Sequence, residues 1–159
     1  MCLGGKLRYD DDQETPDTNT AIFDFGDKQL VWDDRSWAKK TPLDADYDVG
    51  FFGEKGMLVI RGSGYAIYDL DGKELGKGTG NGGDPTHLQN FLDAARGTAK
   101  ANAEIEEGFK SSLLCHVGNI SSRTGRAMTL DPQTHQIVND PEAANLWSRE
   151  YRPGWEPKV

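Results

Sequence analysis

Three polar residues of types that bind ligands recur on one side of a predicted helix. His116, Asn119 and Arg123 are spaced by three and four residues, so they lie on adjoining turns of one helix face. Imidazole, amide and guanidinium groups can together form hydrogen bonds to the hydroxyl groups of a sugar. The simpler interpretation is a polar helix edge whose groups bond to neighbouring loops. The spacing identifies a candidate binding stripe and leaves the solvated edge open.

A glycine-rich run from Gly78 to Gly83 fits the G-x-G-x-x-G pattern of dinucleotide-binding loops, and a predicted helix follows it. That motif requires a buried apolar strand before it and a second parallel strand after the helix. Here the preceding run, residues 73–77, is polar, and another helix follows the first. We therefore interpret the glycines as a loop and expect no cofactor-binding residue in this chain.

Metal ligands and catalytic nucleophiles lack the spacing that their chemistry requires. The 3 histidines form no i, i+4 pair. The acidic run at 10–17 has Thr15 where an EF-hand loop needs its sixth-position glycine. Cys2 and Cys115 form no CxxC pair, and no serine lies in a GxSxG turn. We expect no metal site, and the residues identify no catalytic group.

The elements that must position these residues change type along the chain. Short β-rich runs separated by glycine turns occupy most of residues 4–77. The clearest is a hairpin in which Gly26-Asp27 joins the runs 21–25 and 29–32. The first run, 4–9, also reads as a strand, whereas the charged residues 33–48 predict a long loop. The first half is therefore expected to form an antiparallel meander.

Helical periodicity replaces this pattern over most of residues 84–150. The first predicted helix has Asp84 as its N-cap and ends at Gly97. Its apolar stripe comprises Leu88, Phe91, Leu92 and Ala95. The second runs from about Asn102 to Gly125, and its expected buried stripe comprises Ile105, Phe109, Leu113, Val117 and Ile120. A shorter helix over about 141–150 and an extended tail at 152–159 complete the chain.

Strands followed by helices predict one α+β domain over residues 1–159, a largely antiparallel β-sheet with helices packed on one face. The other face needs a partner, because Phe23, Phe25 and Trp32 are too apolar for a solvated sheet. We therefore expect that face to be a subunit interface in a homo-oligomer.

Composition excludes several classes of partner. The 159 residues carry a net charge of -8, which disfavours nucleic acids and anionic membranes because both require a basic patch. No apolar run is long enough to span a membrane, and no export leader is visible. Two distant cysteines fit a reducing compartment, so a cytoplasmic location is expected, unless a leader was lost from a truncated N-terminus.

Several ordered motifs resemble one protein family. They are GGKLRYDDDQETPDT at 4–18, HLQNFLDAARG at 87–97, NAEIEEGFKSSLLCHVGNISSRTGR at 102–126, and LDPQTH, NDPEAANLWSREY and RPGW up to Trp155. Together they resemble the C-terminal domain of the Gfo/Idh/MocA sugar oxidoreductases, in the form common among planctomycete and Bacteroidetes-type members. The resemblance extends from Gly4 to Trp155 and is weakest over residues 35–80, where only strand pattern and glycines agree.

The resemblance implies an NAD(P)-dependent enzyme acting on a sugar or polyol, although some relatives are glycosidases. In such proteins a Rossmann domain precedes this one and carries the glycine fingerprint and a catalytic lysine. A histidine motif follows before the region matched here. None of these has a counterpart in this chain, so no catalytic residue is carried over and NAD or NADP is implied only for the full-length protein. Glu14 and Asp17, in the DxxETPDT run, are implied to bind a sugar hydroxyl or to hold the loop against the missing domain.

Three functional hypotheses follow. In the first, the chain is the substrate-side and oligomerisation domain of a truncated oxidoreductase and is inactive alone. In the second, it is a stand-alone, non-catalytic module that binds a carbohydrate or a subunit. In the third, it is a subunit completed by a separate Rossmann chain. A large exposed apolar patch on the helical side favours the first or third hypothesis.

Overall fold

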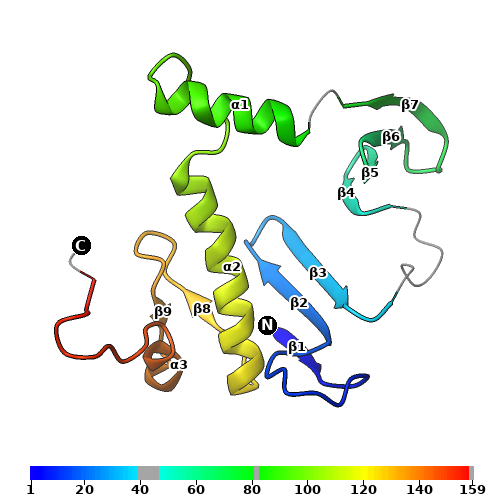
Figure 1. Ribbon diagram of the computed structural model, residues 1–159. Coiled ribbons are helices and arrows are strands. Elements are labelled where there is room, and N and C mark those ends of the chain that lie inside the picture. The colour runs from blue at the N-terminus through cyan, green and yellow to red at the C-terminus, as the bar shows by residue number, and fades with distance from the viewer. Residues whose placement is uncertain (39–46, 81–82, 158–159) are drawn as a thin grey trace. The chain divides into compact units, whose positions relative to one another are not determined.

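In a computed structural model, which describes residues 1–38, 47–80 and 83–157, the chain forms two compact units. One unit comprises Met1–Ala38 and Ile105–Val159, and the other comprises Lys39–Glu104. Antiparallel strands come first and helices dominate later, as Figure 1 shows by the order of its colours. The predicted α+β class is confirmed, with the antiparallel strands distributed over separate sheets.

The first unit is built on a three-stranded antiparallel sheet. Its strands are β1 (Cys2–Gly5), β2 (Thr18–Asp24) and β3 (Gln29–Arg35), in the order β1-β2-β3. The predicted hairpin is confirmed: Gly26 has a φ of 88° and donates its N–H to the Asp24 carboxylate at 2.9 Å. The strand predicted at 4–9 instead ends at Gly5, because the backbone amides that follow turn towards the Asp17 side chain.

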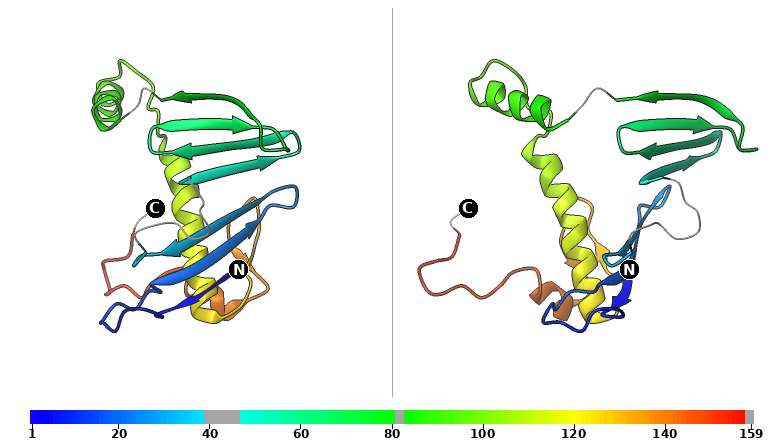
Figure 2. Two further views of the ribbon diagram at one scale, coloured as in Figure 1. Left: turned by 90° about the vertical axis from the view of Figure 1, so that its right-hand side faces the viewer. Right: turned by 45° about the vertical axis from the view of Figure 1, so that its right-hand side comes forward.

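The helix α2 (Ile105–Thr124) packs on this sheet (Figure 2). Leu113, Val117 and Ile120 are buried, as the stripe predicted. Ile105 and Phe109 are exposed, so the prediction for that end of the stripe was wrong. The Phe109 ring lies 5.6 Å from the His135 ring in an edge-on contact, which leaves part of the phenyl group in solvent. The helix begins three residues after the expected start at Asn102.

A small C-terminal layer closes the first unit. The strands β8 (Thr129–Leu130) and β9 (Ile137–Val138) form a hairpin that the sequence analysis missed, and α3 (Pro141–Asn145) follows. Ile120, Ile137 and Ala143 form its buried core. The third helix ends at Asn145, short of the expected 150, and its cap is formed by Leu146. The following residues to 157 contain turns and no helix or strand.

The second unit contains a four-stranded antiparallel meander. Its strands are β4 (Val49–Gly53), β5 (Gly56–Arg61), β6 (Gly64–Tyr68) and β7 (Glu74–Thr79). Each strand pairs with the next, as predicted. The loop expected at 33–48 lies partly within β3 and partly at 39–46, and the latter, like tail residues 158–159, is outside the described residues.

The helix α1 (Asp84–Ala95) also belongs to the second unit. Gly97, with a φ of 75°, follows its end as predicted. The N-cap is Gly83 and not Asp84, which is already helical. No side chain of α1 is buried, and the apolar side chains of Leu88, Phe91 and Leu92 are exposed. No described strand of its own unit packs along this stripe, so its apolar face has no partner within the unit.

Candidate functional site

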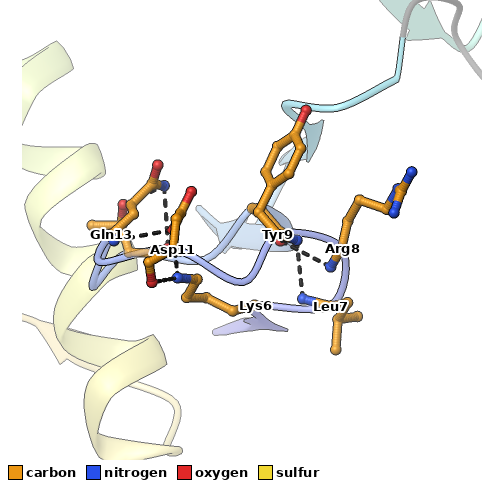
Figure 3. Close-up of polar contacts among 8 residues, drawn as sticks. Lys6, Leu7, Arg8, Tyr9, Asp11 and Gln13 are labelled. Atoms are coloured by element: carbon orange, nitrogen blue, oxygen red, sulfur yellow. Dashed lines mark hydrogen bonds and ion pairs between the residues drawn. The ribbon is translucent and has the colours of Figure 1, made fainter.

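The loop between β1 and β2 is held in shape by one buried carboxylate. Asp17 Oδ2 accepts hydrogen bonds from the backbone N–H groups of Arg8 at 2.9 Å and Tyr9 at 2.8 Å, and Oδ1 accepts one from Leu7 at 3.1 Å. Figure 3 shows the amides of these residues directed to one point. The Thr18 hydroxyl donates to Oδ1 at 2.7 Å. This set of donors explains why β1 cannot continue past Gly5.

These donors fix the charge state of Asp17. Its side chain is 1% exposed, and burial alone would favour the neutral acid. The hydrogen bond from Tyr9 and the other donors stabilise the ionised form more, so the pKa of Asp17 lies far below its usual range. Asp17 is therefore an ionised structural group whose two oxygens accept hydrogen bonds from the loop and from Thr18.

A second cluster shapes the outer part of the same loop. The Lys6 ammonium bonds to the backbone carbonyl and the carboxylate of Asp11. Asp11 Oδ1 also accepts the backbone N–H of Gln13 at 3.0 Å, and the Gln13 side chain donates to the Thr15 hydroxyl at 2.9 Å (Figure 3). The bond from Lys6 is the main reason that the pKa of Asp11 is lowered. The acidic run at 10–17 is thus held by the Lys6 ammonium and by amide groups of the same loop.

The last two turns of α2 face this loop across the end of β1. The backbone N–H of Cys2 donates to the buried Ser121 hydroxyl at 2.8 Å, which fixes the helix against the strand. Ser122 and Arg123 follow Ser121, and Asn119 precedes it by two residues, so all three lie at the edge of the contact. Gly4 instead permits the close approach of β1 to β2, because a Cβ at this position would lie 2.3 Å from the Thr18 carbonyl oxygen.

A polar cleft of about 220 Å³ lies between these elements. It is lined by Gly4, Gly5, Lys6, Glu14, Thr15, Pro16, Asn119, Ser122 and Arg123. The Arg123 guanidinium lies 3.7 Å from the Glu14 carboxylate across it, an ion pair between exposed groups. Among the described residues, Asn119 makes no hydrogen bond through its side chain. The cleft therefore offers charged and neutral polar groups to a small hydrophilic molecule.

The structure brings together some of the candidate residues and separates others. Glu14, Asn119 and Arg123 line the cleft, although they come from segments over 100 residues apart. Asp17 lies beneath the loop, and His116 is exposed on α2 outside the lining. The sequence analysis missed the contributions of Lys6, Thr15 and Ser122. Of these, Ser122 could have been found from its position three residues after Asn119 on the same helix.

The glycine-rich run does not have the geometry of a dinucleotide site. Gly78 lies within β7, which is antiparallel to β6, and Gly80 donates its N–H to the Ser63 carbonyl at 2.7 Å. A dinucleotide loop instead joins a parallel strand to a helix. Asn81 and Gly82 lie outside the described residues. Across residues 1–38, 47–80 and 83–157, no group of three or more His, Cys, Asp or Glu side chains could hold a metal ion.

Comparison with known proteins identifies the family of the chain. Residues 46–157 match the family described as "Oxidoreductase family, C-terminal alpha/beta domain", of the Gfo/Idh/MocA type. No curated protein and no solved structure matches the chain. No helix in the described part of the chain has the length and apolar character needed to cross a membrane. The family match covers well over half of the 159 residues, and the chain therefore belongs to the Gfo/Idh/MocA oxidoreductase family, of which it is a C-terminal domain.

Proposed function

We propose that this chain is the substrate-side and oligomerisation domain of an NAD(P)-dependent sugar or polyol oxidoreductase and is inactive alone. The observation that carries the proposal is the family match, which names a C-terminal domain of an oxidoreductase. A C-terminal domain implies a second part that holds the cofactor, and the antiparallel glycine run in this chain does not supply it. The cofactor half then lies outside residues 1–159 or in a separate subunit.

The polar cleft of the first unit supports the substrate-binding role. Its lining combines Asn119, Ser122 and Thr15 with the charged pair of Glu14 and Arg123. Amide, hydroxyl and charged groups can donate to and accept from sugar hydroxyls. In this role Asn119 and Arg123 bind substrate directly, and Glu14 lies beside Arg123 as its ion-pair partner. Asp17 holds the loop that carries Glu14, and His116 extends the polar face of α2 beyond the cleft.

The exposed apolar stripe of α1 favours the hypothesis that the chain works with a further domain. It is less consistent with a stand-alone module. Leu88, Phe91 and Leu92 are all exposed, and α1 buries no side chain. Exposed apolar stripes of this kind mark surfaces that another protein surface covers. In the proposed function, the cofactor-binding half covers this stripe.

Comparison of the native protein from the source cells with the isolated chain tests the proposal. An antibody against this chain, applied to lysate of the source cells, should detect a polypeptide of about two to three times 17.5 kDa, an ordinary two-domain size. Purified from those cells, this species should bind NADH, detected by its fluorescence, and should oxidise or reduce a sugar or polyol. The isolated 159-residue chain should show neither property. Binding of NADH by the isolated chain, or a native species of 17.5 kDa with no partner, would contradict the proposal.

The four-stranded sheet of the second unit provides the surface for oligomerisation. Strand alternation and register place one set of uncharged side chains on a single face. They are Val49, Phe51, Leu58, Ile60, Tyr65 and Ile67. On β7 this face continues as Gly76 and Gly78, whereas the opposite face carries Lys77 and Glu74. Several side chains of this uncharged face are exposed, among them Val49, Phe51 and Tyr65, which favours pairing with a second copy of the chain.

This assignment changes the residues expected at the interface. Phe23, which the sequence analysis placed there, faces α2, since a Cβ at Gly118 would lie 3.8 Å from the Phe23 ring. Phe51 lies on the uncharged face of the four-stranded sheet. Phe51→Glu should convert an oligomer to a monomer in size-exclusion chromatography with light scattering. Phe52→Glu, on the opposite face of the same strand, is the matched control and should leave the native mass unchanged. The reverse result would assign the interface to the other face.

A further inference from the structure

The cleft of the first unit contains one cation that is held only weakly. Arg123 lies 3.7 Å from Glu14 and, among the described residues, forms no hydrogen bond through its guanidinium. Lys6, the other cation of the lining, is already bonded to both the carbonyl and the carboxylate of Asp11. The planar donors of Arg123 are therefore the charged group that a ligand can use.

The partner of Arg123 is easily displaced. The Glu14 side chain is 84% exposed and that of Arg123 is 60% exposed, so solvent and salt weaken their attraction. Glu14 makes no hydrogen bond to any described residue, and it lies on a loop whose anchors are Asp17 and Asp11. Its carboxylate can move away without breaking the contacts that shape the loop. Glu14 thus occupies the position of a carboxylate ligand.

The rest of the lining suits hydroxyl groups. Asn119 has a free amide among the described contacts, and Thr15 and Ser122 add hydroxyls. Gly4 and Gly5 contribute backbone atoms to the lining. The volume of about 220 Å³ lies below the roughly 300–1,000 Å³ of pockets for drug-sized ligands, so it fits one sugar-sized molecule.

The position of Arg123 selects the type of anion. It lies in the last turn of α2, where the helix dipole places partial negative charge. A chain with a net charge of -8 adds to this field. A doubly charged phosphate would be opposed there more strongly than a singly charged carboxylate, and a single free guanidinium matches a carboxylate with two parallel hydrogen bonds.

We infer that this cleft binds a sugar acid, a polyhydroxylated compound whose carboxylate displaces Glu14 from Arg123 while Asn119 bonds to its hydroxyls. The inference rests on the proposed function and adds the class of substrate. Glu14 is then a competitor for Arg123 and not a ligand-binding group. Removal of the Glu14 carboxylate strengthens binding, whereas removal of the Arg123 guanidinium weakens it.

NMR titration of the ¹⁵N-labelled 159-residue chain tests this inference. Sodium D-glucuronate should shift the amide signals of Gly4, Gly5 and Asn119. D-glucose, D-glucose 6-phosphate and acetate should each bind at least about tenfold more weakly than glucuronate. Arg123→Gln should weaken glucuronate binding by about tenfold, and Arg123→Lys, which keeps the charge, should restore only part of it. Glu14→Gln should tighten binding by about threefold, the effect expected for one exposed ion pair. Arg149→Gln, on the tail, is the matched control and should change nothing.

Each contrary outcome has a distinct meaning. Equal binding of glucose and glucuronate would overturn the choice of a sugar acid and leave the proposed function in place. Equal binding of acetate would show an anion site without sugar recognition, and tighter binding of the phosphate would assign a different anion. Weaker binding by Glu14→Gln would overturn the role of Glu14 as competitor. No shift with any compound would remove this cleft as the site, whereas the NADH and oxidoreductase assays test the proposed function separately.

Discussion

The backbone N–H of Cys2 lies 2.8 Å from the Ser121 hydroxyl oxygen, so the first strand and the end of the long helix are joined across 119 residues of sequence. The same hydroxyl donates to the Arg126 carbonyl at 2.6 Å. One buried hydroxyl therefore accepts a hydrogen bond from a strand amide and donates one to a backbone carbonyl just beyond the end of the helix. The relationship sets the position of α2 against β1, and with it the wall of the cleft.

Ser121→Ala tests this relationship. The substitution leaves a buried amide and a carbonyl without their partner, and we expect it to lower the free energy of unfolding by about 1–3 kcal/mol in urea titrations. Ser111→Ala is the matched control, because Ser111 is exposed and its hydroxyl bonds only to the Glu107 carbonyl of its own helix. Equal effects of the two substitutions would show that the bond from Cys2 contributes nothing.

Asp17→Asn tests the anchor of the cleft loop. An amide accepts fewer and weaker hydrogen bonds than a carboxylate, and its NH₂ group would face the amides of Leu7, Arg8 or Tyr9. We expect a fall in Tm of at least about 5 °C and faster hydrogen exchange at those amides. Asp10→Asn, at an exposed position of the same loop, should leave both unchanged. Unchanged exchange in Asp17→Asn would contradict the anchoring role.

The low pKa of Asp17 predicts a specific pH dependence. The unfolded carboxyl titrates near 3.8, and the folded one well below it, so the unfolded state binds the proton first as the pH falls. The stabilisation is complete above the unfolded pKa and is lost as the pH falls through the folded value. The difference in Tm between the native chain and Asp17→Asn should therefore be largest near pH 7 and smaller near pH 3. A difference that grows on acidification would contradict this assignment.

Gly4→Ala tests the close approach of β1 to β2. The new Cβ would lie 2.3 Å from the Thr18 carbonyl oxygen and 2.6 Å from the Asn19 Cβ, so the strands must separate. We expect a loss of about 1–3 kcal/mol in unfolding free energy, the usual effect of overpacking. Gly76→Ala adds the same group to another strand where no atom lies within 4 Å, and it should change the free energy by less than about 1 kcal/mol. Similar losses in both would show that the cost is not steric.

Local sequence signals predicted most of the elements. Gly26-Asp27 predicted the first hairpin, and Gly97 and Gly125 predicted the ends of α1 and α2. Each signal depends on backbone conformations within a few residues, which the residue types set directly. Boundaries were less accurate where a distant partner decides them. The strand after Cys2 stops at Gly5 because its following amides bond to Asp17, which no local pattern indicates.

The candidate site shows the same division. The spacing of Asn119 and Arg123 on one helix face is a property of the sequence, because the helical repeat fixes it. Their partnership with Glu14, and the exclusion of His116 and Asp17 from the cleft, required the packing of α2 on β1 and the folding of the loop. The sequence by itself determined the α+β class and the family to which the chain belongs. Only the tertiary structure decided which polar groups remain open to a ligand, because hydrogen bonds between distant segments, such as those of Asp17, occupy the others first.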